Sequence, residues 1–254
     1  MSKVISISNQ KGGVGKTTTA LNLSSTIAAA ERKTLLIDMD PQSNATSGLG
    51  VNPKELQKSV YQSIIEKFPL QELILDTQLD FLKLAPANIK LVGAEIELVN
   101  MEKREYALRQ AMESIRENYE YIIIDCPPSL GLLTINALTA ADSVLIPIQC
   151  EYYALEGLTQ LLNTIRLVQK HLNPNLGIEG VLLTMYDPRL NLSRQVAEDV
   201  NRYFKGRVFE TIIHRNVKLS EAPSFGKPII LYDITSRGAE NYIALAEEIL
   251  SHAG

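Results

Sequence analysis

The sequence predicts an α/β fold in which a mostly parallel sheet is covered by helices on both faces. Short runs of apolar residues recur along the chain, and stretches of helical composition lie between them. The runs are apolar throughout rather than alternating, as expected of strands that are buried on both faces of a parallel sheet. A glycine-rich segment, residues 10–18, also joins the first predicted strand to the first predicted helix.

The predicted elements alternate along the whole chain. Strands are expected at 4–8, 34–37, 81–84, 121–124, 143–148 and 180–184. Helices are expected at 17–30, 106–118, 155–171, 193–204 and 239–250. Two polar loops, 40–53 and 221–228, are the longest candidates for mobile segments. Since no repeat or linker interrupts this pattern, a single domain spanning residues 1–254 is expected.

Length and composition limit the class of protein. The chain has 254 residues, of which 45% are hydrophobic and 21% charged, so it can form a large core. Its net charge of −4 excludes a basic field over the whole surface, and any nucleic-acid binding must come from a local patch. No apolar stretch approaches the ~20 residues of a membrane span, and the short apolar start does not resemble a signal peptide. A soluble, cytoplasmic protein is expected.

Residues 10–18 have the composition of a phosphate-binding loop, placed between a strand and a helix. Glycines let backbone N–H groups converge on phosphate oxygens, and the N-terminus of the following helix presents further N–H groups to the anion. Lys16 is expected to reach the β- and γ-phosphates, and the Thr17 hydroxyl is expected to bind Mg²⁺. The predicted nucleotide-binding residues of this loop are Lys11, Gly12, Gly13, Val14, Gly15, Lys16, Thr17 and Thr18.

Two predicted strands end in aspartate near the expected phosphates. Asp38 and Asp40 follow the second strand, and Asp125 ends the apolar run 121–124. Carboxylates at the C-terminal ends of parallel strands lie beside the ligand crevice. An apolar strand ending in aspartate, after a phosphate loop, is the Walker B pattern, so Asp125 is expected to hold Mg²⁺ through water. The pair Asp38 and Asp40 is suited to orienting water and holding metal-bound waters.

The phosphate loop resembles the deviant Walker A motif of the ParA/MinD superfamily, because Gln10 replaces the usual first glycine and a second lysine, Lys11, follows it. Segments 40–50, 151–158 and 220–224 are similar to the ParA/Soj branch in particular, and the resemblance covers nearly the whole chain. It implies a slow ATPase that uses ATP and Mg²⁺ and forms a homodimer in ATP. It also implies a nucleoid-associated protein that binds double-stranded DNA without sequence preference and acts with a ParB-type partner in chromosome or plasmid segregation.

The resemblance assigns catalytic roles within this site. Lys11 is implied to reach across the dimer interface to the partner's phosphates. Asp40 matches the family position that orients the attacking water, and Asp38 matches a position that supports the metal. With Lys16, which contacts the transferred phosphate, Lys11 and Asp40 form the expected catalytic set.

The expected adenine contact departs from the family pattern. The family usually has Ile-Pro-Arg-Asn where residues 213–216 are Ile-His-Arg-Asn. The proline position contacts adenine through its backbone, so His214 is expected to make the same contact through its own backbone. Asn216 is implied to contact the ribose or the adenine.

A DNA-binding patch is expected in the C-terminal third of the chain. Residues 189–237 contain nine Lys or Arg and five Asp or Glu, although the whole chain is acidic. The resemblance favours Arg189, Arg215 and Lys218 as contacts to DNA phosphates. Because phosphates carry no base information, such contacts predict binding without sequence preference.

Two other functional classes stay open on the same scaffold. A MinD-like, membrane-recruited regulator would need a basic amphipathic C-terminal helix, but no Lys or Arg follows Arg237 and the predicted helix carries three glutamates. A metabolic enzyme, such as a ligase or kinase, would not be expected to carry the segment 42–50. Cys126 and Cys150 lack the context of a cluster-binding relative, and structural thiols are expected.

Overall fold

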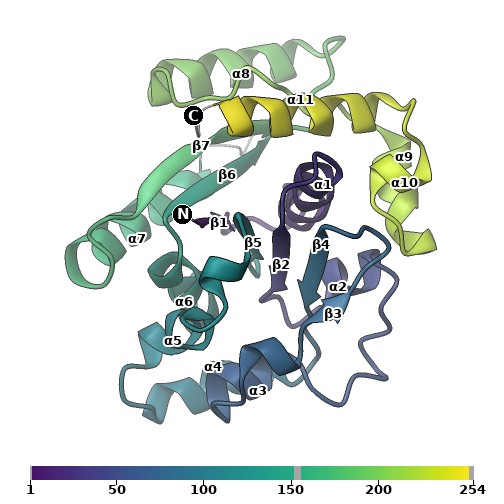
Figure 1. Ribbon diagram of the computed structural model, residues 1–254. Helices are drawn as coiled ribbons and strands as arrows, with labels where there is room; N and C mark the ends of the chain where they lie inside the picture. Colours follow the sequence, from purple (N-terminus) through teal and green to yellow (C-terminus); the bar gives the residue numbers. More distant parts are fainter. Residues whose placement is uncertain (1, 152–155, 252–254) are drawn as a thin grey trace.

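The computed structural model describes residues 2–151 and 156–251 (Figure 1). Its centre is a seven-stranded sheet with the order β3–β4–β2–β5–β1–β6–β7. Neighbouring strands run parallel, except that β3 and β4 pair antiparallel. The strands are β1 (Lys3–Ile7), β2 (Thr34–Asp38), β3 (Leu75–Asp76), β4 (Leu82–Ala85), β5 (Tyr121–Asp125), β6 (Ser143–Gln149) and β7 (Gly177–Thr184). The predicted α/β class with a mostly parallel sheet is confirmed.

Each central strand contributes side chains to two separate cores. On β5, Ile122 and Ile124 belong to one core and Ile123 to the other. On β1, Val4 joins the first core and Ile5 the second. Because successive side chains of a strand point to opposite faces, an uninterrupted apolar run is what a sheet covered on both sides requires.

Helices cover both faces of the sheet. The core that contains Val4 is closed by α3 (Val60–Ile65), α4 (Leu91–Glu97), α5 (Ala107–Met112), α6 (Leu132–Ala140), α7 (Glu156–His171) and α8 (Asn191–Phe204). The core that contains Ile5 is closed by α1 (Lys16–Ala29), α2 (Asn44–Gly48), α9 (Val217–Glu221), α10 (Ile229–Tyr232) and α11 (Arg237–Ser251). Short 3₁₀ helices are η1 (Leu70–Glu72), η2 (Leu98–Asn100), η3 (Arg104–Tyr106), η4 (Arg116–Asn118) and η5 (Ala222–Phe225).

Helix α11 packs across α1 (Figure 1) and buries its apolar face, including Tyr242, Leu245 and Ile249. Its Glu248 carboxylate accepts backbone hydrogen bonds from Glu210 and Thr211 at 2.8 and 3.0 Å. The lack of Lys and Arg after Arg237 favours such a core-packed helix over a membrane-binding one. In the parts of the chain that the structure describes, no helix has both the length and the apolarity needed to cross a membrane.

Several local expectations need correction. The segment 40–53, expected as a polar loop, contains helix α2, and residues 221–228 contain the 3₁₀ helix η5. The helix expected at 106–118 is shorter, because α5 covers only Ala107–Met112 and the 3₁₀ helix η4 follows it before β5 begins. Residues 152–155, which include the expected start of α7 and part of the segment 151–158, lie outside the described residues.

Candidate functional site

The phosphate loop lies where β1 passes into α1, at the C-terminal edge of the sheet. Gly13 and Gly15 have φ angles of 75° and 89°, which side chains with a Cβ rarely adopt. A Cβ at Gly15 would come no closer than 3.8 Å to Thr184, so backbone conformation rather than space requires glycine there. Helix α1 has no acidic residue in its first turn, so its N-terminal N–H groups are available to an anion.

Lys16 is buried at the first turn of α1, and its ammonium group donates to the Lys11 carbonyl oxygen at 3.0 Å. Burial lowers the pKa of Lys16, whereas the nearby Asp125 carboxylate acts in the opposite direction. The Lys11 side chain is half-exposed, while its backbone N–H donates to Asn9 Oδ1 at 3.0 Å. The two lysines therefore differ, since one is held inside the loop and the other reaches solvent.

The two strand-end aspartates are neighbours across the sheet, because Asp38 of β2 pairs in register with Asp125 of β5. Both carboxylates are fully buried. Among the described residues, neither Asp125 oxygen has a hydrogen-bond partner of ordinary geometry. Burial together with the Asp38 charge raises the pKa of Asp125 well above its usual range, and the nearby Thr17 hydroxyl opposes this shift. A bound cation would interact with the unpaired oxygens and would offset the free-energy cost of burying this negative charge beside Asp38. The Asp125 carboxylate therefore fits a Mg²⁺ site.

No cluster of three or more His, Cys, Asp or Glu side chains suited to a metal occurs in residues 2–151 and 156–251. Mg²⁺ is commonly bound by one or two protein groups together with phosphate and water, so a sparse protein shell is compatible with it. Thr17 and Asp125 are the groups that would hold the ion. Their roles stay predictions.

Asp38 differs from Asp125 because both of its carboxylate oxygens accept hydrogen bonds from the chain. Its Oδ2 accepts from the Thr46 hydroxyl at 2.7 Å and the Thr46 N–H at 2.8 Å, and its Oδ1 accepts from the Asp40 N–H at 3.1 Å. Burial raises its pKa to about 6, and the Thr46 hydrogen bonds oppose this shift. The metal-supporting role of Asp38 stays a prediction, and the hydrogen bonds that its carboxylate accepts all come from the chain itself.

Two adjoining cavities lie along the C-terminal edge of the sheet, each of about 390 Å³. The phosphate-side cavity is lined by Gly12, Lys16, Asp40 and Pro128, among others. The base-side cavity is lined by Leu21, Ile213, His214, Asn216, Pro223 and Tyr242, among others. Both share Gly15, Thr17, Thr18, Asn44 and Met185, so together they form a groove with a polar end and a more apolar end.

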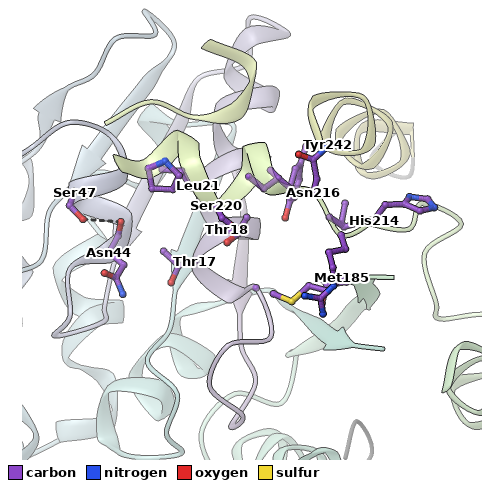
Figure 2. Close-up of a pocket in the computed structure, with 16 residues that line it drawn as sticks. Thr17, Thr18, Leu21, Asn44, Ser47, Met185, His214, Asn216, Ser220 and Tyr242 are labelled. Atoms are coloured by element: carbon purple, nitrogen blue, oxygen red, sulfur yellow. Dashed lines mark hydrogen bonds between the residues drawn. The ribbon is translucent and has the colours of Figure 1, made fainter. Parts of the chain in front are cut away.

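The base-side wall is residues 213–223, and Figure 2 shows how its side chains lie. The His214 ring points away from the cavity and meets Tyr186 edge-on, with ring centroids 5.6 Å apart. The His214 backbone N–H donates to Asn241 Oδ1 at 3.0 Å, and the ring Nδ1 lies 3.2 Å from the same oxygen. Asn216 caps α9 by accepting from the Lys218 N–H at 2.8 Å. A base contact through the backbone of His214 is compatible with this geometry and stays a prediction.

Several residues of the groove were not identified from the sequence. The Thr184 hydroxyl, at the end of β7, donates to the Val14 carbonyl at 2.8 Å and anchors the phosphate loop. Tyr242, buried on α11, lies 3.2 Å from the Thr19 hydroxyl through its own hydroxyl oxygen. A polar residue at a strand end is a weak signal for Thr184, and nothing local distinguishes Tyr242 from an ordinary core residue.

The three predicted DNA contacts are exposed, and each forms an ion pair. Arg189 pairs with Asp187 at 2.7 Å, Arg215 with Glu151 at 3.3 Å, and Lys218 with Glu221 at 3.1 Å. The Arg215 N–H donates to the Tyr186 carbonyl at 3.1 Å, which places Arg215 on the segment beside that of Arg189. These acids reduce the local positive charge, and surface pairs of this kind are weak enough to exchange partners.

The two cysteines are separate buried thiols. Cys126 Sγ lies 3.2 Å from the hydroxyl oxygens of both Ser6 and Ser8. Burial raises the pKa of Cys126 to about 11 and that of Cys150 to about 12. Both cysteines therefore fit the structural, unreactive thiols that the sequence predicts.

Comparisons with known proteins agree with this geometry. A family model described as an AAA domain matches residues 2–178. The chromosome partitioning protein ParA of Myxococcus xanthus is 60% identical over 248 residues, which cover 98% of this chain and 88% of that protein. The sporulation initiation inhibitor protein Soj of Bacillus subtilis is 60% identical over 252 residues, covering 99% and 100%.

A solved structure has the same fold. Cobyrinic acid a,c-diamide synthase from Mycobacterium smegmatis, with a bound ATP analogue and magnesium, is 38% identical with a TM-score of 0.88. The match covers 100% of this chain and 96% of that one. The identity to the two partitioning relatives is higher and extends along nearly the whole chain. The chain belongs to the ParA/Soj family of chromosome-partitioning ATPases.

Proposed function

We propose that this protein is a Mg²⁺-dependent ATPase that dimerises when ATP is bound, binds DNA without sequence preference as a dimer, and acts with a ParB-type partner in segregation. The observation that carries the proposal is the groove that the two cavities form together. Its polar end is lined by the phosphate loop, with Lys16, and by Asp40. The buried Asp125, which has no hydrogen-bond partner among the described residues, lies close enough to Lys16 for their charges to interact. The other end of the groove is a more apolar cavity of about 390 Å³, which has room for a purine base.

The proposed reaction is attack of water on the γ-phosphorus. A bond forms between the water oxygen and that phosphorus, the bond to the β–γ bridging oxygen breaks, and ADP and inorganic phosphate leave with the water's proton on the phosphate. Bound Mg²⁺ supplies neutralisation of phosphate charge. Lys16 and the loop N–H groups hold the phosphates, and Asp40, at the wall of the same cavity, orients the water.

Dimerisation is proposed to complete the site. Gly12 and Gly13 are exposed, and a Cβ on Gly12 would meet only Pro128, at 4.0 Å. This part of the loop therefore leaves space for a second protomer. Lys11, whose side chain is half-exposed, would then reach the partner's phosphates.

DNA binding is proposed to use Arg189, Arg215 and Lys218, with the existing carboxylate partners replaced by DNA phosphates. A dimer doubles the number of such contacts, so binding should depend on ATP. Association with the nucleoid would follow. We also propose that the described chain works as a single domain, since α1 and α11, from opposite ends of the sequence, share one core.

The decisive experiment is size-exclusion chromatography with light scattering in ATP, ADP and no nucleotide, each with and without double-stranded DNA. We expect a monomer without nucleotide and a dimer in ATP. We expect the complex with DNA to form in ATP but not in ADP or without nucleotide. ATP turnover measured with and without the ParB-type partner completes the test. A chain that stays monomeric in ATP, or binds DNA equally in all three states, would contradict the proposal.

A metabolic enzyme is the second candidate, because the structure at 38% identity is named as a cobyrinic acid a,c-diamide synthase. The same turnover assay separates the two. ATP hydrolysis that responds to cobyrinic acid, and is unaffected by DNA and the ParB-type partner, would favour the enzyme.

A further inference from the structure

Asp38 and Asp125 lie side by side on neighbouring strands and are equally buried, but their hydrogen bonding differs. The Asp125 oxygens accept no hydrogen bond from the described residues, whereas the Asp38 oxygens accept three. A buried carboxylate without donors is suited to a cation. A buried carboxylate that already accepts several hydrogen bonds instead holds in place the groups that donate them.

Asp38 holds both ends of one short segment, residues 40–46. Its Oδ1 binds the N–H at the start of the segment, on Asp40, and its Oδ2 binds the N–H and hydroxyl at the end, on Thr46. Between them the chain makes a tight turn, in which the Ser43 N–H donates to the Asp40 carbonyl at 2.8 Å and Ser43 has a φ of 57°. The segment is closed onto a single buried carboxylate.

Thr46 is the centre of this closure. Its hydroxyl has one proton, which it donates to Asp38, and it accepts from the Ala87 N–H at 2.9 Å. The side chain is fully buried. Thr46 therefore joins the end of β2 to the chain that leaves β4, with its hydroxyl used as both donor and acceptor.

We propose that Thr46, through Asp38, is a positioning residue for Asp40. Since Asp40 orients the attacking water in the proposed function, on which this assignment rests, the position of its backbone determines where its carboxylate points. The Asp40 Oδ1 also accepts from the Gln42 N–H at 2.9 Å, within the same closed segment. Asp38 acts through hydrogen bonds to the chain, and Asp125 is left for the metal.

Thr46→Val tests the assignment, because valine keeps the shape of the side chain and removes the hydroxyl. ATP affinity measured by calorimetry should match wild type, since Thr46 lines neither cavity. The dimer should form in ATP and persist. Turnover should fall by about ten- to a hundredfold, because a displacement on the order of 1 Å at a catalytic group has effects of this size.

Two variants serve as controls. Thr46→Ser keeps the hydroxyl and should restore most of the turnover. Thr139→Val makes the same change at a buried threonine of α6 whose hydroxyl has no partner among the described residues, and should leave turnover unchanged. Equal losses in Thr46→Val and Thr46→Ser would overturn the assignment, as would wild-type turnover in Thr46→Val.

The combination with Asp40→Ala separates positioning from a general structural role. If Thr46 acts through Asp40, Thr46→Val should lower turnover no further once Asp40 is alanine, because effects within one functional unit are not additive. A full additional loss would assign Thr46 to structure alone. Wild-type turnover in Asp40→Ala itself would instead contradict the proposed function, so the two failures are distinguishable.

If Thr46→Val does not fold, Asp38→Asn can be used to test the same assignment. The asparagine side chain has a single oxygen, so one of its two groups of donors loses its acceptor. Calorimetry should show the same ATP affinity as the wild-type protein, both with and without Mg²⁺. A turnover assay should show a reduced rate. A selective loss of the Mg²⁺-dependent affinity would show that Asp38 serves the metal, and the positioning role would be wrong.

Discussion

The phosphate loop, residues 10–18, and the base-side wall, residues 213–223, line the same groove but are built differently. The loop is one continuous segment whose chemistry is its own, with a buried ammonium, exposed glycines and the N-terminus of α1. The wall takes its form from distant segments, because His214 is held by Asn241 and pairs with Tyr186. The loop presents charge and N–H groups to the groove, whereas the wall presents backbone and apolar surface.

This difference predicts how each region responds to mutation. Truncating a side chain should be severe where the side chain supplies charge to a phosphate. It should be mild where the backbone makes the contact and the side chain points elsewhere, as the His214 ring does in Figure 2. The following changes test this contrast, from the largest expected effect to the smallest.

Lys16→Ala should abolish nucleotide binding. Its ammonium group is buried at the first turn of α1, where no other side chain of the helix brings charge to the phosphates. Calorimetric titration with ATP should give no measurable heat of binding, while circular dichroism should show a folded protein. ATP affinity equal to wild type would contradict the assignment of the loop.

Lys11→Ala and Asp40→Ala should separate two later steps. Lys11→Ala should bind ATP and remain monomeric, because its proposed partner is the phosphate of the other protomer. Asp40→Ala should dimerise in ATP and persist as a dimer, with turnover reduced ~10²-fold or more. Light scattering and a phosphate-release assay measure both, and a Lys11→Ala dimer in ATP would count against action in trans.

Gly12→Val should block dimerisation without loss of fold. A Cβ at this position meets only Pro128, at 4.0 Å, and Gly12 has no positive φ angle, so the backbone of the monomer accepts a residue with a Cβ there. ATP should still bind, and light scattering in ATP should report a monomer. Thermal denaturation provides the control, since a large fall in melting temperature would attribute the effect to misfolding.

Charge reversal at Arg215 and Lys218 should weaken DNA binding and leave ATP-dependent dimerisation intact. Both belong to the base-side wall, but their charged groups pair with Glu151 and Glu221 at the surface. Each lost phosphate contact should reduce the slope of log K against log salt by roughly 0.9 for duplex DNA, for any sequence. A DNA titration at several salt concentrations tests this, and unchanged affinity and slope in the double variant would remove these residues from the interface.

His214→Ala should have the smallest effect. Its ring lies outside the cavity, and alanine retains the N–H that donates to Asn241, so ATP affinity should change by less than about twofold. Calorimetry again provides the measurement. A tenfold loss would show that the ring itself contacts the nucleotide, and the contrast between loop and wall would then fail.

Much of the fold follows from local pattern. The strands at 121–124 and 143–148 were predicted within a residue or two, because strands buried on both faces are continuously apolar. Helix α2 was missed, since residues 44–48, Asn-Ala-Thr-Ser-Gly, have poor helix propensity. It forms because Thr46 binds Asp38, a contact made by the fold rather than by local preference.

The sequence by itself determined the phosphate loop, the lysines on it and the aspartates at the ends of two strands, because these depend on residue type and short spacing. Only the tertiary structure decided which aspartate is hydrogen-bonded to the chain, since Asp38 accepts from Thr46 whereas Asp125 forms no hydrogen bond of ordinary geometry with the described residues. It also brought Thr184 and Tyr242, distant in sequence, to the groove. Such contacts depend on how parallel strands are ordered across the sheet, and strand order arises from packing of the whole chain rather than from any single segment.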